Sequence, residues 1–334
     1  MTSQFASPAN LFKSERFDLR KLHYFARIVE LGSMSKASAA LRIAQPALSK
    51  SIRCLEFDLR TPLLERSTKG VRPTRAGEKL YEHCKAVFRQ LELARAEIQG
   101  PGDVPCGTVT IGIPYSVNLI LAAAILRETL IRFPDVDLHI IEDHSTGIAA
   151  HLNSNRLDIG VMVSEGTMNA ALHVEEVVQE ELLLVRRCNG DGSEAGKVHL
   201  EEVVDRPLIL AKGQLRAMVE ERFARRALSL NAVREIETFN MIPRCVEAGI
   251  GDAILPAGWI SALALTRTTC LSFEDKAMSR RLAICHFAAR PLSYAAMCVK
   301  RLVQEVTAEL IETHQWRSAR LTNGSSAALA RSAA

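Results

Sequence analysis

Residues 33–60 read SMSKASAALRIAQPALSKSIRCLEFDLR, and their pattern decides the fold of the N-terminal region. Ser33 or Ser35 can cap a short helix, whose small alanines allow another helix to approach closely. After a brief turn, Gln45 and Pro46 open a second helix, because proline is favoured in a first helical turn. The apolar residues of this second helix recur at helical spacing and are Leu48, Ile52, Leu55 and Leu59. The pattern predicts a helix-turn-helix.

The opposite side of the second helix is polar and basic, with Pro46, Ser49, Lys50 and Arg53 near its N-terminal end. In a helix-turn-helix these positions face base edges in the major groove. Lysine and arginine there suit the O6 and N7 acceptors of guanine. Since any amphipathic helix exposes polar residues, the prediction depends equally on the small-residue helix and the turn before it.

The flanking segments complete a winged helix. Asp18 can cap a preceding helix, which Gly32 ends because glycine accepts the left-handed conformation. Residues 61–74 contain two short apolar pieces around a Lys-Gly turn, which indicates a small hairpin, or wing. We expect the basic residues of this wing to lie beside DNA phosphates, and they are Arg66, Lys69 and Arg72.

A long helix is predicted over residues 75–99, capped by Thr74. Its apolar residues alternate at steps of four and three, which is typical of a helix that pairs with a second copy. This dimerisation seam consists of Leu80, Cys84, Val87, Leu91, Ala94 and Ile98. Packing of the seam on its own domain is the alternative. The Gly-Pro-Gly run at residues 100–102 then marks a linker.

The basic residues are concentrated near the N-terminus. Residues 13–75 contain 14 Lys and Arg against six Asp and Glu, a balance of +8, whereas the whole chain has a net charge of +4. A basic region on an otherwise acidic chain is typical of a protein that binds a polyanion. A solvated basic face is the alternative.

Composition narrows the class of protein. A chain of 334 residues with 48% hydrophobic residues favours two domains with well-formed cores. The longest uncharged apolar stretch, residues 253–266, is too short to span a bilayer, and the N-terminus lacks a signal-peptide pattern. Eight scattered cysteines without a CxxC pair predict reduced thiols, not zinc or disulfides. We expect a cytoplasmic, nucleoid-associated protein with no metal, no cofactor and no membrane partner.

From Gly107 onward, strand and helix patterns alternate, which predicts an α/β region with a parallel sheet. The expected strands cover residues 109–113, 136–142, 157–163, 181–187, 207–211, 233–237, 252–256 and 282–287, and a closing helix covers 292–312.

Open α/β sheets bind ligands where helices begin beyond the carboxyl ends of strands. Ser116, Ser145 and Thr146 lie at two such junctions, where they could contact an anionic or polar effector. Helix capping alone explains these residues equally well. Lys212 and Thr238 lie on loops that could face the same effector, although a solvated lysine is the simpler reading of Lys212.

The run from Leu22 to Arg75 resembles the DNA-binding domain of bacterial LysR-type transcriptional regulators. The match is ungapped, and it is carried by Phe25, Gly32-Ser33, Ala39-Ala40, Gln45-Pro46-Ala47-Leu48-Ser49, Ile52, Leu55-Glu56, Pro62-Leu63, Arg66 and Thr74-x-Ala76-Gly77. The resemblance implies that Gln45, Pro46, Ser49 and Lys50 face bases, while Arg53, Arg66 and Lys69 hold the backbone. Ser35 and Arg72 complete the expected DNA-binding set. Arg60 and Leu64 stand where the family usually has glycine and phenylalanine.

The rest of the chain resembles the effector domain of the same family, which has the two-lobed architecture of periplasmic solute-binding proteins. The motifs are Gly107-x-Val109-x-Ile111-Gly112, Phe133-Pro134-x-Val136, Arg156-Leu157-Asp158-Ile159-Gly160, and Glu247-Ala248-Gly249-Ile250-Gly251 before Leu255-Pro256. The chain resembles the branch that contains the nitrogen assimilation control regulator. In positions matching Ser116 and Ser145, related sensors contact their effector.

The resemblance implies a division of the chain into a flexible N-terminus (1–16), a winged helix-turn-helix (17–74), a linker helix and hinge (75–106), effector lobe I (107–164 and 272–316), effector lobe II (165–271) and a flexible tail (317–334). It also implies a homodimer or homotetramer on an inverted-repeat promoter site, contact with RNA polymerase if the protein activates, and a small effector between the lobes. An effector-independent regulator is the alternative within this branch.

Two other classes of protein fit the sequence poorly. An enzyme would carry a motif such as HExxH, GxSxG, a P-loop or GxGxxG, and none is present. A transport-type solute-binding protein would match the C-terminal region but would need export and no basic helix-turn-helix.

Overall fold

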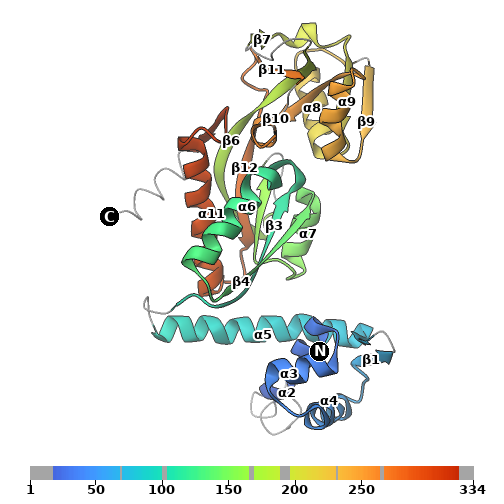
Figure 1. The fold of residues 1–334 in the computed structure, drawn as a ribbon, viewed down its shortest axis with the longest axis vertical. Coiled ribbons are helices and arrows are strands. Elements are labelled where there is room, and N and C mark those ends of the chain that lie inside the picture. The colour runs from blue at the N-terminus through green and yellow to red at the C-terminus, as the bar shows by residue number, and fades with distance from the viewer. Residues whose placement is uncertain are drawn as a thin grey trace, which may run out of the picture. The chain divides into compact units, whose positions relative to one another are not determined.

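The structure is a computed structural model of the chain, and it describes residues 18–67, 70–99, 104–164, 169–188, 196–230, 232–263 and 267–322. The flexible N-terminus predicted for residues 1–16 lies outside these ranges. The chain forms two compact units, Met1–Gln99 and Gly100–Ala334 (Figure 1).

The N-terminal unit contains three short helices, a hairpin and a long helix. These elements are α2 (Leu19–Leu31), α3 (Met34–Leu41), α4 (Gln45–Leu59), β1 (Leu64–Ser67), β2 (Gly70–Pro73) and α5 (Arg75–Gln99). The predicted caps are present, because Asp18 accepts from the Arg20 amide and Thr74 from the Gly77 amide. Ser33, and not Ser35, caps α3. The winged helix-turn-helix predicted from the sequence is confirmed.

The apolar stripes of these helices form one core. Its buried members are Leu22, Phe25, Ala26, Ile28, Met34, Ala37, Leu48, Ile52, Leu55, Leu63, Val71 and Cys84. Each fully buried large side chain stabilises the unit by roughly 1.5–3 kcal/mol. The core therefore fixes α4 between α2, α3 and the hairpin.

The entry to the hairpin is fixed from α4. The amides of Leu63 and Leu64 both donate to Glu56 Oε1, at 2.8 and 3.1 Å. Arg60 ends α4 with a left-handed φ of 52°, a conformation that explains why glycine is usual there. Leu64 is half-buried and packs against the core in place of phenylalanine. Neither departure from the family pattern prevents the β1–β2 hairpin from forming.

Lobe I of the C-terminal unit is built on the strand order β4-β3-β5-β12, covered by helices α6, α7 and α11 (Figure 1). The bounds are β3 (Gly107–Pro114), α6 (Tyr115–Arg132), β4 (Val136–Asp143), α7 (Ser145–Asn153), β5 (Ile159–Val163), β12 (Ser279–Phe287) and α11 (Tyr294–Glu312).

Lobe II continues the sheet in the order β6-β10-β8-β9. Its elements are β6 (Leu172–Arg187), β7 (Gly196–Val198), η1 (Leu200–Glu202), β8 (Pro207–Ala211), α8 (Gln214–Ala224), β9 (Ala232–Ile236), η2 (Phe239–Met241), α9 (Ile242–Glu247), β10 (Asp252–Pro256), α10 (Ala257–Ser261) and β11 (Thr268–Phe273). The 16-residue strand β6 pairs with β12 over its first part and with β10 and β11 over its last part. It therefore belongs to both lobes.

The sheet is mixed and not purely parallel. β3 pairs in parallel with β4 and β5, and β8 with β9 and β10, as predicted. The connecting strands β6, β11 and β12 instead run antiparallel to their partners in β5, β6 and β10. The α/β class is confirmed, and the parallel prediction is wrong for the strands that join the lobes.

The structure departs from the sequence prediction at β6 and in the tail, and the strands β7 and β11 were not predicted. β6 begins at Leu172, nine residues before the strand expected at Glu181, because glutamates interrupt its apolar alternation. The flexible tail predicted from residue 317 is wrong for Ala319–Leu321, which form β13 and pair with β6. The remainder of that tail, from residue 323, lies outside the described residues. No helix in the described parts of the chain is long and apolar enough to cross a membrane.

Candidate DNA-binding surface and effector cleft

The N-terminal end of α4 presents the predicted base-reading residues to solvent. Gln45, Pro46, Lys50 and Arg53 are exposed, and Ser49 is half-buried. The buried stripe of α4 forces these side chains outward, since Leu48, Ile52 and Leu55 are fully buried. Ser35 of α3 donates to Gln45 Oε1 at 3.3 Å, which joins the two helices at this surface.

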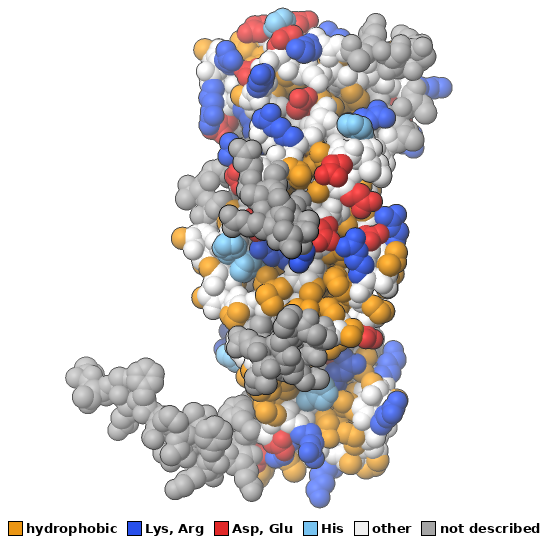
Figure 2. Space-filling model, turned by 90° about the vertical axis from the view of Figure 1, so that its left-hand side faces the viewer, with side chains coloured by type: hydrophobic (Ala, Val, Ile, Leu, Met, Phe, Trp, Pro, Cys, Tyr) orange, Lys and Arg blue, Asp and Glu red, His pale blue; other side chains and the backbone are white. Residues whose placement is uncertain are grey.

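Three cations of this surface can be followed among the described residues. No carboxylate of the described residues pairs with Lys50, Arg53 or Arg72, and all three side chains are exposed. On the face of the N-terminal unit drawn in Figure 2, blue basic side chains are more prominent than red acidic ones. Such cations can neutralise phosphates without first breaking an ion pair.

The structure describes only part of the wing residues that were predicted to bind phosphates. Arg72 lies on β2 and is exposed. The backbone of Arg66 lies in β1, but its side chain and the whole of Lys69 lie outside the described residues. The amide of Val71 donates to Gly32 O at 2.9 Å, so the wing is attached to the end of α2.

The predicted dimerisation seam on α5 divides into two halves. Leu80 is half-buried and Cys84 is buried in the core of its own unit, where burial raises the pKa of the Cys84 thiol to about 12. Val87 and Leu91 are 38% and 49% exposed. Ala94 is also exposed, and the side chain of Ile98 lies outside the described residues. Of the two halves of the seam, the second leaves described apolar side chains uncovered.

The C-terminal unit contains a small cleft between its lobes, with a cavity of about 50 Å³. Three helices begin at this cleft, namely α6, α7 and α8, and none of them has a side-chain N-cap hydrogen bond. The lining residues are Pro114, Tyr115, Ser116, His144, Ser145, Val163, Ala211, Lys212, Gln214, Leu215, Met218, Phe239 and Arg280. Helix N-termini carry amides without intrahelical acceptors, so the cleft is suited to a negatively charged group, and at the start of α7 the Asp143 carboxylate already accepts from the His144 amide.

Two of the predicted effector residues meet in this cleft and are buried. Ser145 Oγ accepts from the Val163 amide at 3.2 Å, and Ser116 Oγ accepts from Arg280 Nη1 at 2.8 Å. Because each oxygen is used as an acceptor, each hydroxyl proton remains available for donation. Neither serine acts as a helix cap.

The other three predicted effector residues are more exposed. Lys212 lines the cleft but also pairs with Glu237 at 2.7 Å, a hydrogen bond that raises the pKa of Lys212. Thr146 and Thr238 are exposed and do not line the cleft. Arg280 was not predicted from the sequence, since its place in the cleft depends on a partner 100 residues away.

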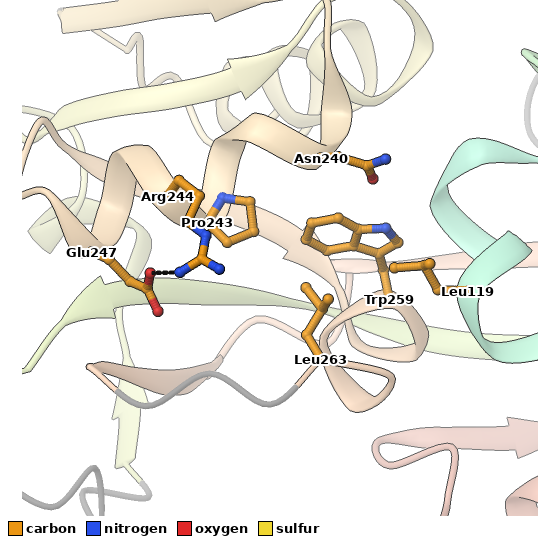
Figure 3. Close-up of a pocket in the computed structure, with 7 residues that line it drawn as sticks. All are labelled: Leu119, Asn240, Pro243, Arg244, Glu247, Trp259 and Leu263. Atoms are coloured by element: carbon orange, nitrogen blue, oxygen red, sulfur yellow. Dashed lines mark hydrogen bonds and ion pairs between the residues drawn. The ribbon is translucent and has the colours of Figure 1, made fainter.

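A second cavity, of about 280 Å³, lies beside α6, α9 and α10 (Figure 3). Leu119, Pro243, Trp259 and Leu263 make it largely apolar, and Arg244 pairs with Glu247 across 2.9 Å at one side. The Trp259 ring packs edge-on against Phe239, which lines the interlobe cleft. In the described residues, no group of three or more His, Cys, Asp or Glu side chains could hold a metal ion.

Comparison with protein families matches both units. Residues 19–78 match the bacterial regulatory helix-turn-helix protein of the lysR family, and residues 102–308 match the LysR substrate binding domain. The nitrogen assimilation regulatory protein nac of Escherichia coli is 30% identical over 305 residues, which cover 90% of this chain and 99% of that protein. The protein of the same name from Klebsiella aerogenes is 30% identical over 86% of this chain and 94% of its own length.

Solved structures share the fold. A Corynebacterium glutamicum OxyR C206 mutant has a TM-score of 0.68 at 22% identity and covers 88% of this chain and 94% of its own. Full-length CbnR in complex with its target DNA has a TM-score of 0.54 at 18% identity, with 87% and 99% covered. The chain therefore belongs to the LysR family and is a LysR-type DNA-binding transcriptional regulator with an effector-binding domain.

Proposed function

We propose that this regulator binds an inverted-repeat operator as a dimer, or as a tetramer of two dimers. The exposed N-terminal end of α4 supports entry into the major groove, where Lys50 can donate to guanine and Gln45 to adenine or guanine. The uncovered half of the α5 seam, Val87 to Ala94, supports pairing with a second copy. Two recognition helices related by a twofold axis would read half-sites about one helical turn apart.

The regulator works on chromosomal DNA in the cytoplasm, and RNA polymerase is its further partner where it activates. A small anionic effector in the interlobe cleft controls its activity. The convergence of three uncapped helix N-termini on one cavity carries this part of the proposal, since each N-terminus bears roughly half a positive charge. The Ser116 and Ser145 hydroxyls add two donors.

The size of the cavity favours a compact ligand. About 50 Å³ suits an oxyanion or a single carboxylate, whereas drug-sized ligands fill pockets of roughly 300–1,000 Å³. The same small volume favours a second candidate, a regulator that needs no effector.

Thermal unfolding and operator binding of the full-length protein test these candidates. Sulfate, phosphate and acetate would be compared with chloride at constant ionic strength. We expect one of the three anions to raise the midpoint temperature of unfolding of the C-terminal unit and to change the affinity of the protein for its operator. Ser145→Ala should remove both responses. Ser154→Ala, at the far end of α7 and outside the cleft lining, is the matched control. Responses that are equal for all anions and unchanged in Ser145→Ala would favour the effector-independent regulator.

A further inference from the structure

A buried ion pair lies under the interlobe cleft. Arg280 at the start of β12 and Glu180 on β6 are cross-strand neighbours, 2% and 0% exposed at their side chains. Arg280 Nε and Nη2 lie 2.8 and 2.6 Å from Glu180 Oε1. A charged pair this deeply buried costs desolvation energy, so it persists only when further hydrogen bonds satisfy both groups.

Glu180 is held from two further segments. Its Oε2 accepts from the Gly258 amide at 2.7 Å and from Trp316 Nε1 at 3.0 Å. A Cβ at Gly258 would lie 2.9 Å from that oxygen and 2.4 Å from Trp316 Nε1, so the contact requires glycine. The carboxylate therefore accepts three hydrogen bonds beside its ion-pair contact with Nη2, and it has a fixed position where β6 passes between the lobes.

The end of the Arg280 guanidinium that carries Nη1 and Nη2 also contacts a cleft residue, Ser116. It lines the cavity, and Nη1 donates to Ser116 Oγ at 2.8 Å while Nη2 donates to Ser116 O at 3.4 Å. With the Nε bond to Glu180, these hydrogen bonds use three of the five guanidinium N–H groups. The second N–H of Nη1 makes no hydrogen bond within the described residues.

We propose that Arg280 is a specificity-determining residue of the interlobe cleft and that Glu180 is its built-in counter-ion. This inference rests on the proposed anionic effector. The effector accepts from Arg280 Nη1 and from the Ser116 hydroxyl, while Glu180 keeps the guanidinium oriented. Because Glu180 already balances the charge, an anion gains less from Arg280 than it would from an unpaired cation. The pair thereby sets how tightly the cleft holds negative charge.

Three full-length variants test the pair by titration with sodium sulfate against sodium chloride at constant ionic strength. Glu180→Gln removes the counter-ion but keeps the cation, so we expect sulfate to bind at least about tenfold more tightly than in the wild type. Glu180→Gln with Arg280→Gln removes both charges and should lose that gain. Trp316→Phe removes one hydrogen bond to Glu180 but keeps both charges, so it should destabilise the unit without tightening sulfate binding.

A purely structural role for the pair predicts a different result. In that case Glu180→Gln and Trp316→Phe would both lower the unfolding midpoint and leave sulfate affinity unchanged, which would overturn the proposal. If Glu180→Gln folds only when sulfate is present, the proposal is supported.

If Glu180→Gln does not fold under either condition, Arg280→Lys decides. Lysine keeps the charge but cannot reach Glu180 and the cleft together, and an unchanged sulfate affinity in this variant would overturn the proposal. Wild-type protein that ignores sulfate while Glu180→Gln binds it would refute an effector for the native cleft but retain Arg280 as the anion-recognising group.

Discussion

The DNA-binding surface and the interlobe cleft use positive charge in opposite ways. Lys50, Arg53 and Arg72 are exposed and unpaired with described carboxylates, so they can move to meet phosphates and bases. In the cleft, Arg280 is buried and Lys212 is exposed, but both are paired with glutamates. A polyanion supplies many charges at variable positions, whereas a compact ligand must be met by groups already in place. The two surfaces therefore differ in whether their cations are already paired with described carboxylates.

The buried pair should show the largest effect. Arg280→Met leaves Glu180 buried without a counter-charge, and we expect the effector unit to lose about 3–5 kcal/mol of unfolding free energy. Chemical denaturation followed by a signal from this unit measures the loss. Adding Glu180→Gln should recover part of it, and a double variant as unstable as Arg280→Met would contradict the assignment of the loss to an unpaired charge.

On the DNA-binding surface, Lys50→Ala should weaken operator binding by about 1–3 kcal/mol and relax base choice at one position of each half-site. The expected cause is the loss of a base-edge donor. Binding titrations on the operator and on single-base variants measure both effects. Undiminished discrimination between these DNAs would mean that Lys50 does not face a base.

Arg72→Ala should act differently from Lys50→Ala. We expect weaker binding to specific and unrelated DNA alike, with the salt dependence reduced by about one phosphate contact, because a wing arginine holds the backbone. The slope of log affinity against log salt measures this change. A loss confined to the operator sequence would place Arg72 on a base edge instead.

Cys84 is an ionisable group that is buried in its neutral form, in contrast to the buried and charged Arg280. Burial raises its thiol pKa to about 12, so iodoacetamide at pH 8.5 should leave Cys84 unmodified while alkylating the exposed Cys106. The raised pKa favours the protonated folded form. Stability from this group is therefore complete below the ordinary thiol pKa of about 8.5 and falls as pH rises toward 12. Mass spectrometry of the labelled native protein compares the alkylation of Cys84 with that of Cys106. Equal labelling would show that the Cys84 thiol is accessible to solvent and not buried in the core.

The exposed pair should show the smallest effect. Lys212 lies 2.7 Å from Glu237, about as close as Arg280 lies to Glu180. Because both Lys212 and Glu237 are exposed, solvent screens the attraction between their charges. Lys212→Met should leave the unfolding midpoint unchanged within error at physiological salt. A clear shift would show that the loop depends on this pair.

The features that could be predicted from the sequence are those that depend on residues close together in the chain. The buried stripe of α4 and the caps at Asp18 and Thr74 depend on residues within one turn of each other, and the sequence was sufficient for them. The cleft serines follow from strand-to-helix junctions, so their meeting was also predictable. Glu180 and Arg280 were not, because strand register across 100 residues brings them together. The antiparallel joining strands were missed for the same reason.

Helix α5 belongs to the winged-helix core at Cys84 and is uncovered at Leu91, only two turns further along. In a pair of such helices, the point of crossing would fix where each α4 lies relative to the symmetry axis. Inserting one residue between these positions would rotate the uncovered half by about 100° and advance it by about 1.5 Å. The rotational position of the uncovered half of α5 would then set the distance between the two α4 helices, and so the spacing of the operator half-sites. An insertion or deletion in this short segment could change that spacing without changing any residue that reads a base.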